Sequence, residues 1–356
     1  MKIKAVDIAR HLGISKATVS LALNHRPGVS ETTREKVLEC KTWMEAEQER
    51  KRSGGVIKYV FLGGNPATLP KDSRQNFGKR TTEGILGYLQ GTRYTLDKEM
   101  IIFDESIEGV YQAARLCNQE GAAGVFIIFS DNLPNLSAEQ LSVFGQFHMP
   151  IVLYDSDIPT LSYDQVRAGN GLAAEIALRH LYNMGHRHVG YLRTGNSTNY
   201  NLTKRFEGAK KCVDYLIKSG LHMDFVYIRD TDNEKLQRNL EASIDAHHRE
   251  IRNYLYREKN LPTGFVCDNF VASAVLIEEL DRIGLKVPEN CSVVGIDPPW
   301  DLVKGNALTY VDLLDDRRGR FAVQRLVERI EGKSAETIQC EVAPVLIQGN
   351  TVRKLI

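Results

Sequence analysis

The stretch ARHLGISKATVSLALN, residues 9–24, contains the most specific structural pattern of this chain. Gly13 separates two short helical patterns, and the second of them begins with small and hydroxyl residues. Glycine adopts the positive φ of a tight turn at little cost, and Ser15 can cap the helix that follows. Ser30 can cap a third helix in the same way. The sequence therefore predicts a helix-turn-helix unit, in which the third helix buries the apolar faces of the other two.

The second helix of such a unit enters the major groove of DNA with its first residues against the base edges. Lys16 can donate to guanine there, whereas Ala17 and Leu21 can only contact a thymine methyl group or exclude a larger group. Other side chains of the unit are better placed for phosphates, which position a protein without reading sequence. These are Ser15, Thr18, Ser20, Asn24, His25 and Arg34. For Thr18 and Ser20, hydrogen bonding within the helices themselves is the alternative.

The charge of the chain is divided unevenly between its two parts. The 356 residues have a formal net charge of +1. Residues 1–58 hold 12 Lys and Arg against 7 Asp and Glu, a net +5, and the remainder holds 34 against 38, a net −4. A basic head on a mildly acidic body indicates that the head alone meets a polyanion. The six cysteines are scattered without a CxxC pair, so neither a disulfide framework nor a zinc site is expected.

The sequence lacks the usual patterns of membrane insertion, secretion and catalysis. No apolar run reaches the roughly 18 residues of a membrane span, and no signal-peptide core follows the first lysines, so we expect a cytoplasmic protein. GxSxG, HExxH and GxxxxGK[ST] are absent, so we expect neither an enzyme nor a bound cofactor. The histidine pairs 186/188 and 247/248 have no acidic or cysteine partner at ligand spacing, and no metal site is expected.

From about residue 58 onward, short β-rich runs alternate with helical patterns. This alternation predicts parallel sheets with helices on both faces. About ten such strands over about 300 residues suit two doubly wound lobes rather than a single sheet. Ligands of such folds bind beyond the carboxyl ends of the strands. We therefore expect a binding site in the cleft between the lobes.

Residues 6–37, VDIARHLGISKATVSLALNHRPGVSETTREKV, resemble the DNA-binding head of the LacI/GalR repressor family. The resemblance continues in LRHLYNMGHRHVGYL (178–192) and GLKVPENCSVVGID (284–297), and so covers nearly the whole chain. It implies a helix-turn-helix head joined to a two-lobed effector domain like that of periplasmic sugar-binding proteins. The resemblance leads us to expect three parts, namely the head over 1–49, a linker over 50–58 and the effector domain over 59–356. The expected lobes are about 59–163 with 315–340, and about 164–314 with 341–356.

The linker departs from the family pattern. The family normally has a Tyr-x-Pro-Asn segment and a hinge helix whose leucine enters the minor groove, whereas residues 43–55 read WMEAEQERKRSGG. An inserted side chain unstacks a base step and kinks the duplex. We therefore expect no central kink of the usual kind, and we interpret 50–58 as a solvated tether. The alternative is that Arg50, Lys51 and Arg52 contact phosphates or a narrow minor groove.

The resemblance also assigns residues of the cleft. Asp155, Arg205 and Asp297 match polar cleft positions, and Asp268 lies where the usual Ala-Asn-Asp order is changed. Carboxylates and a guanidinium bind vicinal hydroxyls, so the implied effector is a sugar or a sugar derivative. The aromatic side chains on which a sugar ring could stack are Phe77, Trp300 and Tyr200. In the long polar segment 65–80, Lys71 and Arg74 either admit an acidic effector or belong to a solvated loop.

Together these features predict a sequence-specific transcriptional regulator, more often a repressor in this family, that a small effector controls. We expect a homodimer, because one head buries too little surface for specificity and twofold dimers read paired half-sites. The alternative from another class is a cytoplasmic sugar-binding module whose head contacts proteins. A steep salt dependence of DNA binding distinguishes the two, because neutralised phosphates release counterions.

Overall fold

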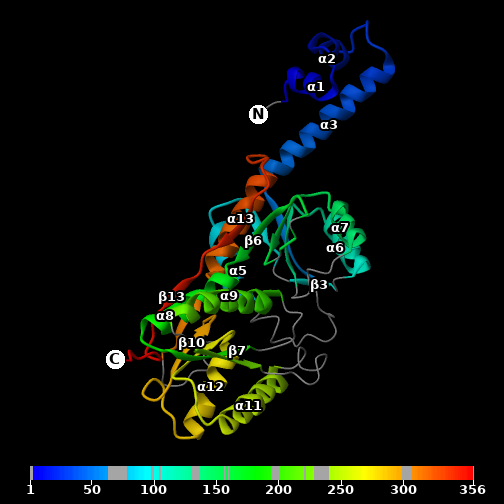
Figure 1. The fold of residues 1–356 in the computed structure, drawn as a ribbon. Coiled ribbons are helices and arrows are strands. Elements are labelled where there is room, and N and C mark those ends of the chain that lie inside the picture. The colour runs from blue at the N-terminus through cyan, green and yellow to red at the C-terminus, as the bar shows by residue number, and fades with distance from the viewer. Residues whose placement is uncertain are drawn as a thin grey trace.

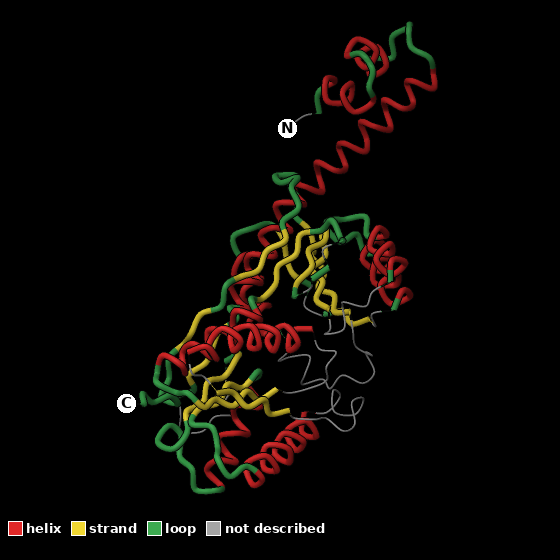
Figure 2. The backbone as a smooth tube through the Cα atoms, in the orientation of Figure 1, coloured by secondary structure: helices red, strands yellow, loops and turns green. Residues whose placement is uncertain are grey.

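The chain forms a small helical head, one long helix and two α/β lobes arranged in a row (Figure 1). The computed structural model describes residues 3–62, 78–97, 100–103, 106–129, 137–155, 157–158, 160–193, 200–219, 222–227, 240–298 and 307–355. Its strands belong to two separate sheets, one in each lobe (Figure 2). The predicted fold class, a helix-turn-helix head on a doubly wound two-lobed body, is confirmed.

The head consists of α1 (Ala5–Leu12), α2 (Lys16–Leu23) and the first part of α3 (Glu31–Ser53). Gly13 ends α1 with a φ of 65°, as the turn requires. Ser15 accepts a hydrogen bond from the backbone N–H of Thr18 at 3.0 Å and so caps α2, and Ser30 caps α3. The buried side chains between the helices are Ile8, Ala9, Val19, Ala22, Val37 and Cys40.

Helix α3 runs without a break from the head to the first strand. Its 23 residues correspond to a length of roughly 34 Å. No glycine or proline interrupts the sequence from 43 to 52, and the helix ends where Gly54 takes a φ of 77°. This corrects the tether expected over 50–58, because residues 50–53 form the last turn of α3 and β1 begins at Gly55.

The first lobe, adjacent to α3, is built on a sheet of seven strands within the described residues. The strand order is β12-β6-β5-β4-β1-β2, with β3 also paired to β1, and every pair is parallel. The strands are β1 (Gly55–Leu62), β2 (Tyr94–Leu96), β3 (Ile101–Phe103), β4 (Gly124–Phe129), β5 (Ile151–Tyr154), β6 (Asp164–Ala168) and β12 (Gln339–Val342). Helices α5 (Lys79–Leu89) and α13 (Asp315–Ile330) pack on one face, and α6 (Ile107–Gln119) and α7 (Ala138–Val143) on the other.

The second lobe has a sheet of six strands within the described residues, in the order β13-β11-β10-β9-β7-β8. Only β13 runs antiparallel, against β11. The strands are β7 (His188–Arg193), β8 (His222–Tyr227), β9 (Gly264–Cys267), β10 (Ser292–Ile296), β11 (Thr309–Asp312) and β13 (Val345–Ile347). Helices α8 (Asn170–Asn183) and α9 (Tyr200–Leu216) cover one face, and α11 (Leu240–Arg257) and α12 (Phe270–Arg282) cover the other.

The chain passes between the lobes after β6, after β11 and between β12 and β13. Because β6 pairs with β5 and β12, it belongs to the first lobe, and the first crossing lies after Ala168 rather than at the expected boundary after residue 163. The last crossing likewise lies beyond Val342 rather than after residue 340. The carboxyl ends of both sheets meet at these crossings, which places the cleft there. None of the described helices is long and apolar enough to cross a membrane.

Candidate functional site

The outer face of α2 presents most of the side chains that we predicted to meet DNA. Ser15, Lys16, Ala17, Ser20, Asn24 and His25 are exposed, and Thr18, Leu21 and Arg34 are half-buried. The face is therefore made of small and polar groups, with one cation in the first turn of the helix. The positive end of the helix dipole lies at the same end, which favours the approach of a phosphate.

Several of these polar groups also bond within the head. The hydroxyl groups of Ser15 and Thr18 lie 2.8 Å apart, as part of the cap of α2. The side-chain amide of Asn24 donates to the carbonyl of Ser20 at 2.8 Å. Capping within the helix, the alternative for Thr18, is therefore present, and it leaves the Lys16 and Ala17 side chains as the exposed part of the first turn.

Arg34 stabilises the loop between α2 and α3. Its guanidinium donates to the carbonyls of Ala22 and Arg26 at 3.1 and 3.2 Å, and only 12% of its side chain is exposed. These bonds close the loop over the end of α2. Sequence reasoning assigned Arg34 to phosphate contact, and the structure shows that two of its five donors bond the backbone of the head.

A cleft of about 250 Å³ lies between the carboxyl ends of the two sheets. Three residues that the sequence predicted for the effector site line it together, namely Asp155, Arg205 and Asp297. Asp155 follows β5 of the first lobe, and Asp297 follows β10 of the second. The apolar part of the lining comes from Ile128, Tyr154, Phe270, Pro298 and Leu313.

In the first lobe, Arg318 of α13 holds two carboxylates at the cleft wall. It is 2% exposed, and it donates hydrogen bonds to Asp155 and to Asp315. Its guanidinium carbon lies 4.8 Å from the ring centre of Tyr154. Burial opposes the charge of Arg318, but the neighbouring Asp155, Tyr154 and Asp315 outweigh it and raise its pKa. Arg318 therefore stays a cation, and burial raises the pKa of Asp155 from its usual value.

In the second lobe, Arg205 of α9 has the equivalent role. It donates to Asp297 Oδ2 at 2.9 Å, to the backbone carbonyl of Asp268 at 2.5 Å and to the side chain of Asn170 at 2.9 Å. Burial lowers and the carboxylates raise the pKa of Arg205, with a net rise. Burial also raises the pKa of Asp297. Asp268, although predicted for the site, is fully buried and is not part of the cleft lining.

A close crossing of α8 and α9 positions Arg205. Gly171 and Gly208 lie at this crossing, where a Cβ on Gly208 would stand 2.2 Å from the backbone oxygen of Gly171. Only glycine therefore permits this approach. The approach brings the guanidinium of Arg205 within hydrogen-bond distance of Asn170, the first residue of α8.

Sequence reasoning missed Asp315, Arg318 and Phe270. Asp315 and Arg318 belong to α13, for which no cleft residue was predicted, although the i, i+3 pair of opposite charges in DDRR is a usable signal. Phe270 directly follows the predicted CDN segment. The predicted stacking residues Phe77 and Trp300, like Lys71 and Arg74, lie outside the described residues.

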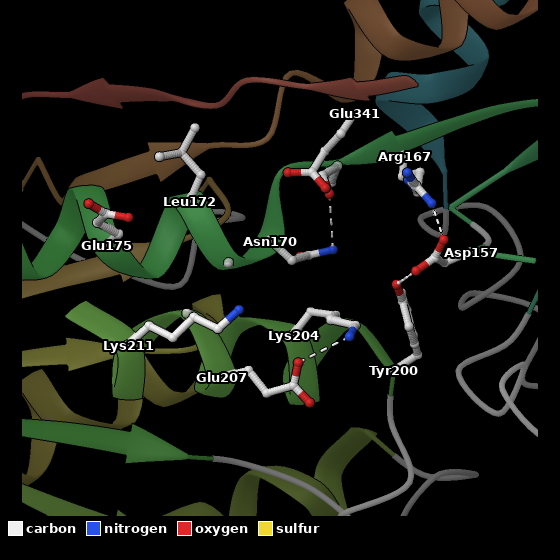
Figure 3. A pocket seen from close by; sticks show the side chains of 13 residues that line it. Asp157, Arg167, Asn170, Leu172, Glu175, Tyr200, Lys204, Glu207, Lys211 and Glu341 are labelled. Atoms are coloured by element: carbon white, nitrogen blue, oxygen red, sulfur yellow. Dashed lines mark hydrogen bonds and ion pairs between the residues drawn. The ribbon is translucent and has the colours of Figure 1, made fainter. Parts of the chain in front are cut away.

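Tyr200 lines a separate side pocket of about 380 Å³ rather than the cleft (Figure 3). Its hydroxyl donates to Asp157, which also accepts from Arg167. Tyr200 begins α9 of the second lobe and Asp157 follows β5 of the first, so this hydrogen bond links the lobes. Acidic and basic side chains alternate around the pocket, as with the pair Lys204 and Glu207 at 3.0 Å, which leaves no strong excess of either charge.

Known families match both parts of the chain. The family of bacterial regulatory proteins of the lacI type matches residues 4–40, and the periplasmic binding protein-like domain matches residues 178–352. The first match covers the helix-turn-helix head, and the second covers most of the second lobe and α13.

Full-length relatives and solved structures agree with these matches. The chain is 25% identical over 357 residues to the HTH-type transcriptional repressor PurR of Photobacterium profundum, covering 98% of each chain. It superposes on the lac repressor dimer bound to operator with a TM-score of 0.63 at 18% identity, over 99% of this chain and 100% of that one. The regulator CelR in complex with cellobiose gives a TM-score of 0.63 at 18% identity, over 97% and 98%. The chain thus belongs to the LacI/GalR family and is a DNA-binding transcriptional repressor regulated by a small-molecule effector.

Proposed function

We propose that the effector of this repressor is an uncharged, hydroxyl-rich molecule of the sugar class, bound in the cleft between the lobes. The main support for this proposal is that each buried arginine pairs with a partly exposed carboxylate. Arg318 pairs with Asp155, and Arg205 pairs with Asp297. Carboxylate oxygens held in this way accept hydrogen bonds from hydroxyl groups.

The charge of the cleft supports an uncharged effector. The carboxylates of Asp155, Asp297 and Asp315 face two guanidinium groups, which leaves an excess of one negative charge. An acidic effector would meet this excess without a free cation among the described lining residues. Phe270 adds flat apolar surface for the C–H face of a sugar ring. Two structural neighbours are described with bound cellobiose and bound ribose.

We further propose that the protein acts in the cytoplasm as a homodimer whose two heads read paired half-sites. Lys16 and Ala17, with Leu21, contact bases, and the other predicted residues of the head contact phosphates. An effector that binds one lobe arrangement better than the other changes the spacing of the heads. A coupling of about 1–3 kcal/mol then changes DNA affinity by about 5–150-fold.

The first experiment is a thermal melt of the purified full chain against neutral sugars, sugar acids and phosphosugars. A ligand at about 100 times its dissociation constant adds about 2.7 kcal/mol, which a melting scan detects. We expect hits among the neutral sugars. Stabilisation by acidic sugars alone would contradict the proposed charge preference, and no stabilisation by any sugar would contradict the proposed class.

The second experiment tests the cleft with Arg205→Ala. We expect this variant to lose the response to the effector while the free protein still binds DNA, because Arg205 lies in the second lobe and far along the chain from the head. DNA binding is measured by fluorescence anisotropy with and without the stabilising sugar. The control is Arg179→Ala, which removes a partly exposed arginine of α8 that pairs with Glu175 one turn away. An unchanged response in Arg205→Ala would remove Arg205 from the site.

A further inference from the structure

Three side chains that commonly ligate metals meet at the outer edge of the second sheet. His188 is the first residue of β7, and His222 and Asp224 belong to the edge strand β8. The parallel register pairs His188 with His222 and Gly190 with Asp224. Because side chains alternate along a strand, His222 and Asp224 lie on the same face as His188. The histidines begin their strands, so the cluster lies at the opposite end of the sheet from the cleft.

The ligand atoms of this cluster are already close together. Nε2 of His188 lies 2.8 Å from Oδ2 of Asp224, and Nε2 of His222 lies 3.3 Å from Oδ1 of Asp224. All three ligand atoms lie within 4.8 Å of one another. Zinc bonds of about 2.0–2.2 Å in a tetrahedral site place neighbouring ligand atoms roughly 3.3–3.6 Å apart. Small side-chain rotations therefore bring all three groups onto one ion.

The backbone and the solvent exposure suit an accessible site. The carbonyl of His188 accepts from both the N–H and the hydroxyl of Thr263, at 3.0 and 3.1 Å, so this end of β7 is fixed. The His222 side chain is 72% exposed, which leaves room for water as a further ligand.

We propose that His188, His222 and Asp224 bind one divalent first-row transition-metal ion of the zinc type. Two imidazole nitrogens and one carboxylate oxygen favour Zn²⁺, Co²⁺ or Ni²⁺ over Mg²⁺ or Ca²⁺, which take oxygen ligands. The ion takes the place of the proton that His188 shares with Asp224, and it ties the edge strand β8 to β7. This site is independent of the effector cleft, and within the described residues it is the one group of three such ligands.

The test is a Co²⁺ titration of the chelator-treated full chain, followed by the visible absorption of protein-bound Co²⁺ and by calorimetry. We expect one Co²⁺ per chain, displaced by Zn²⁺, and a melting temperature that rises with Zn²⁺. In His222→Ala we expect the affinity to fall more than about 100-fold, since even the loss of a group behind the ligands costs about 10–100-fold. His222 is largely exposed, so the variant should melt like the parent without metal.

The matched control is His148→Ala, which removes an exposed histidine of the first lobe outside the cluster. We expect this control to keep the Co²⁺ stoichiometry, the affinity and the Zn²⁺-dependent rise in melting temperature. The separate variant Asp224→Asn should also lose affinity for Co²⁺, because it removes the negative charge at the site. Unchanged binding in His222→Ala would place the metal elsewhere, and a parent chain without saturable Co²⁺ binding would overturn the proposal outright.

Discussion

Asp155 and Asp297 both take a left-handed backbone conformation at the end of a strand, with φ of 53° and 75°. A non-glycine residue in this region costs about 1–3 kcal/mol, and such strain gathers at binding sites. The backbone N–H of Asp155 donates to the carbonyl of Val166, and the backbone N–H of Asp297 donates to the carbonyl of Val311. Each acceptor lies on the neighbouring strand. The strained backbone thereby turns each carboxylate away from its sheet and into the cleft, so both lobes use the same arrangement of strand, aspartate and buried arginine.

Lys16 provides a test of base recognition. In Lys16→Ala we expect the loss of about 1–3 kcal/mol of discrimination at one base pair, because a good side-chain contact to a base is worth about that much. The stability of the head should not change, because Lys16 is exposed and α2 keeps its Ser15 cap. Binding of operator variants with single base-pair changes measures the effect. Equal weakening on every sequence would show that Lys16 contacts a phosphate.

Glu279 makes the stability of the second lobe depend on pH. Burial alone would raise the pKa of Glu279, but hydrogen bonds from Arg252 and His248 and the charge of Arg282 lower it from 4.5 to about 2. A carboxyl whose pKa is lower in the folded state stabilises the protein above pH 4.5. This stabilisation is lost as the pH falls from 4.5 towards 2.

The change Glu279→Gln should therefore flatten the loss of stability between pH 4.5 and 2, and it should lower stability at pH 7. Urea unfolding midpoints at pH 7, 4.5 and 3 measure both effects. The matched control is Glu278→Gln, because Glu278 is the adjacent residue of α12 and is exposed. If the control and Glu279→Gln gave the same pH dependence, the buried charge network would not be its cause.

The strands that the sequence predicted are those whose sequences are strongly apolar. The runs GVFIIFS, PIVLYDSD and CSVVGID became β4, β5 and β10, because buried parallel strands are continuously apolar. Sequence reasoning missed β6 (DQVRA) and β12 (QCEV), which are short and polar and pair with each other near the edge of the first sheet. Their pairing depends on residues more than 170 positions apart, as Gln165 and Gln339 show. The boundaries of the lobes therefore could not be read from local composition.

A substitution at Gly208 tests the close crossing of α8 and α9. In Gly208→Ala the new methyl group would collide with the backbone of Gly171, so the helices must separate. We expect a loss of about 1–3 kcal/mol of stability, typical of overpacking, and weaker effector binding because Arg205 moves away from Asn170. Thermal melts and calorimetry with the effector measure the two effects.

The matched control is Gly87→Ala in α5, where no atom beyond the neighbouring residues and backbone of its own helix lies within 4 Å of the added methyl group. Alanine favours helix more than glycine does, so this control should be neutral or stabilising by up to about 1 kcal/mol. An equal loss in both variants would show that the close crossing is not what limits position 208.

For the molecule as a whole, the expected topology predicted the cleft. The side-chain contacts between the lobes became visible only in the structure. The rule for doubly wound sheets predicted only the cleft, whereas the family resemblance assigned Asp155 and Asp297 to it. The structure places these two residues on opposite walls although 142 positions separate them. The links between the lobes were not predictable, because they join side chains that are distant in the chain. Arg80 of α5 pairs with Asp312 at 2.8 Å, and Tyr200 donates to Asp157. The cluster of His188 with His222 and Asp224 was missed for the same reason.

The continuity of α3 leads to a prediction for the whole complex with DNA. The chain passes from α3 to β1 through Gly54 alone, and residues 43–55 contain no leucine that could enter the minor groove. We expect a central bend below about 20°, the lower limit of kinks made by inserted side chains. A circular-permutation assay with the operator measures the bend. A sharper central kink would contradict the proposed role of this segment.

Helix α3 has the geometry of a lever arm. It ends at Gly54 beside the first lobe, and the head lies at its far end, away from the lobes (Figure 1). A tilt of 10° at Gly54 would displace the head by roughly 6 Å, nearly two base-pair steps of about 3.4 Å. In the proposed dimer, a small rotation of the first lobe on effector binding would therefore become a larger displacement between the two heads along the double helix. The length of α3 would then set how far the first lobe has to rotate to move a head by one base-pair step.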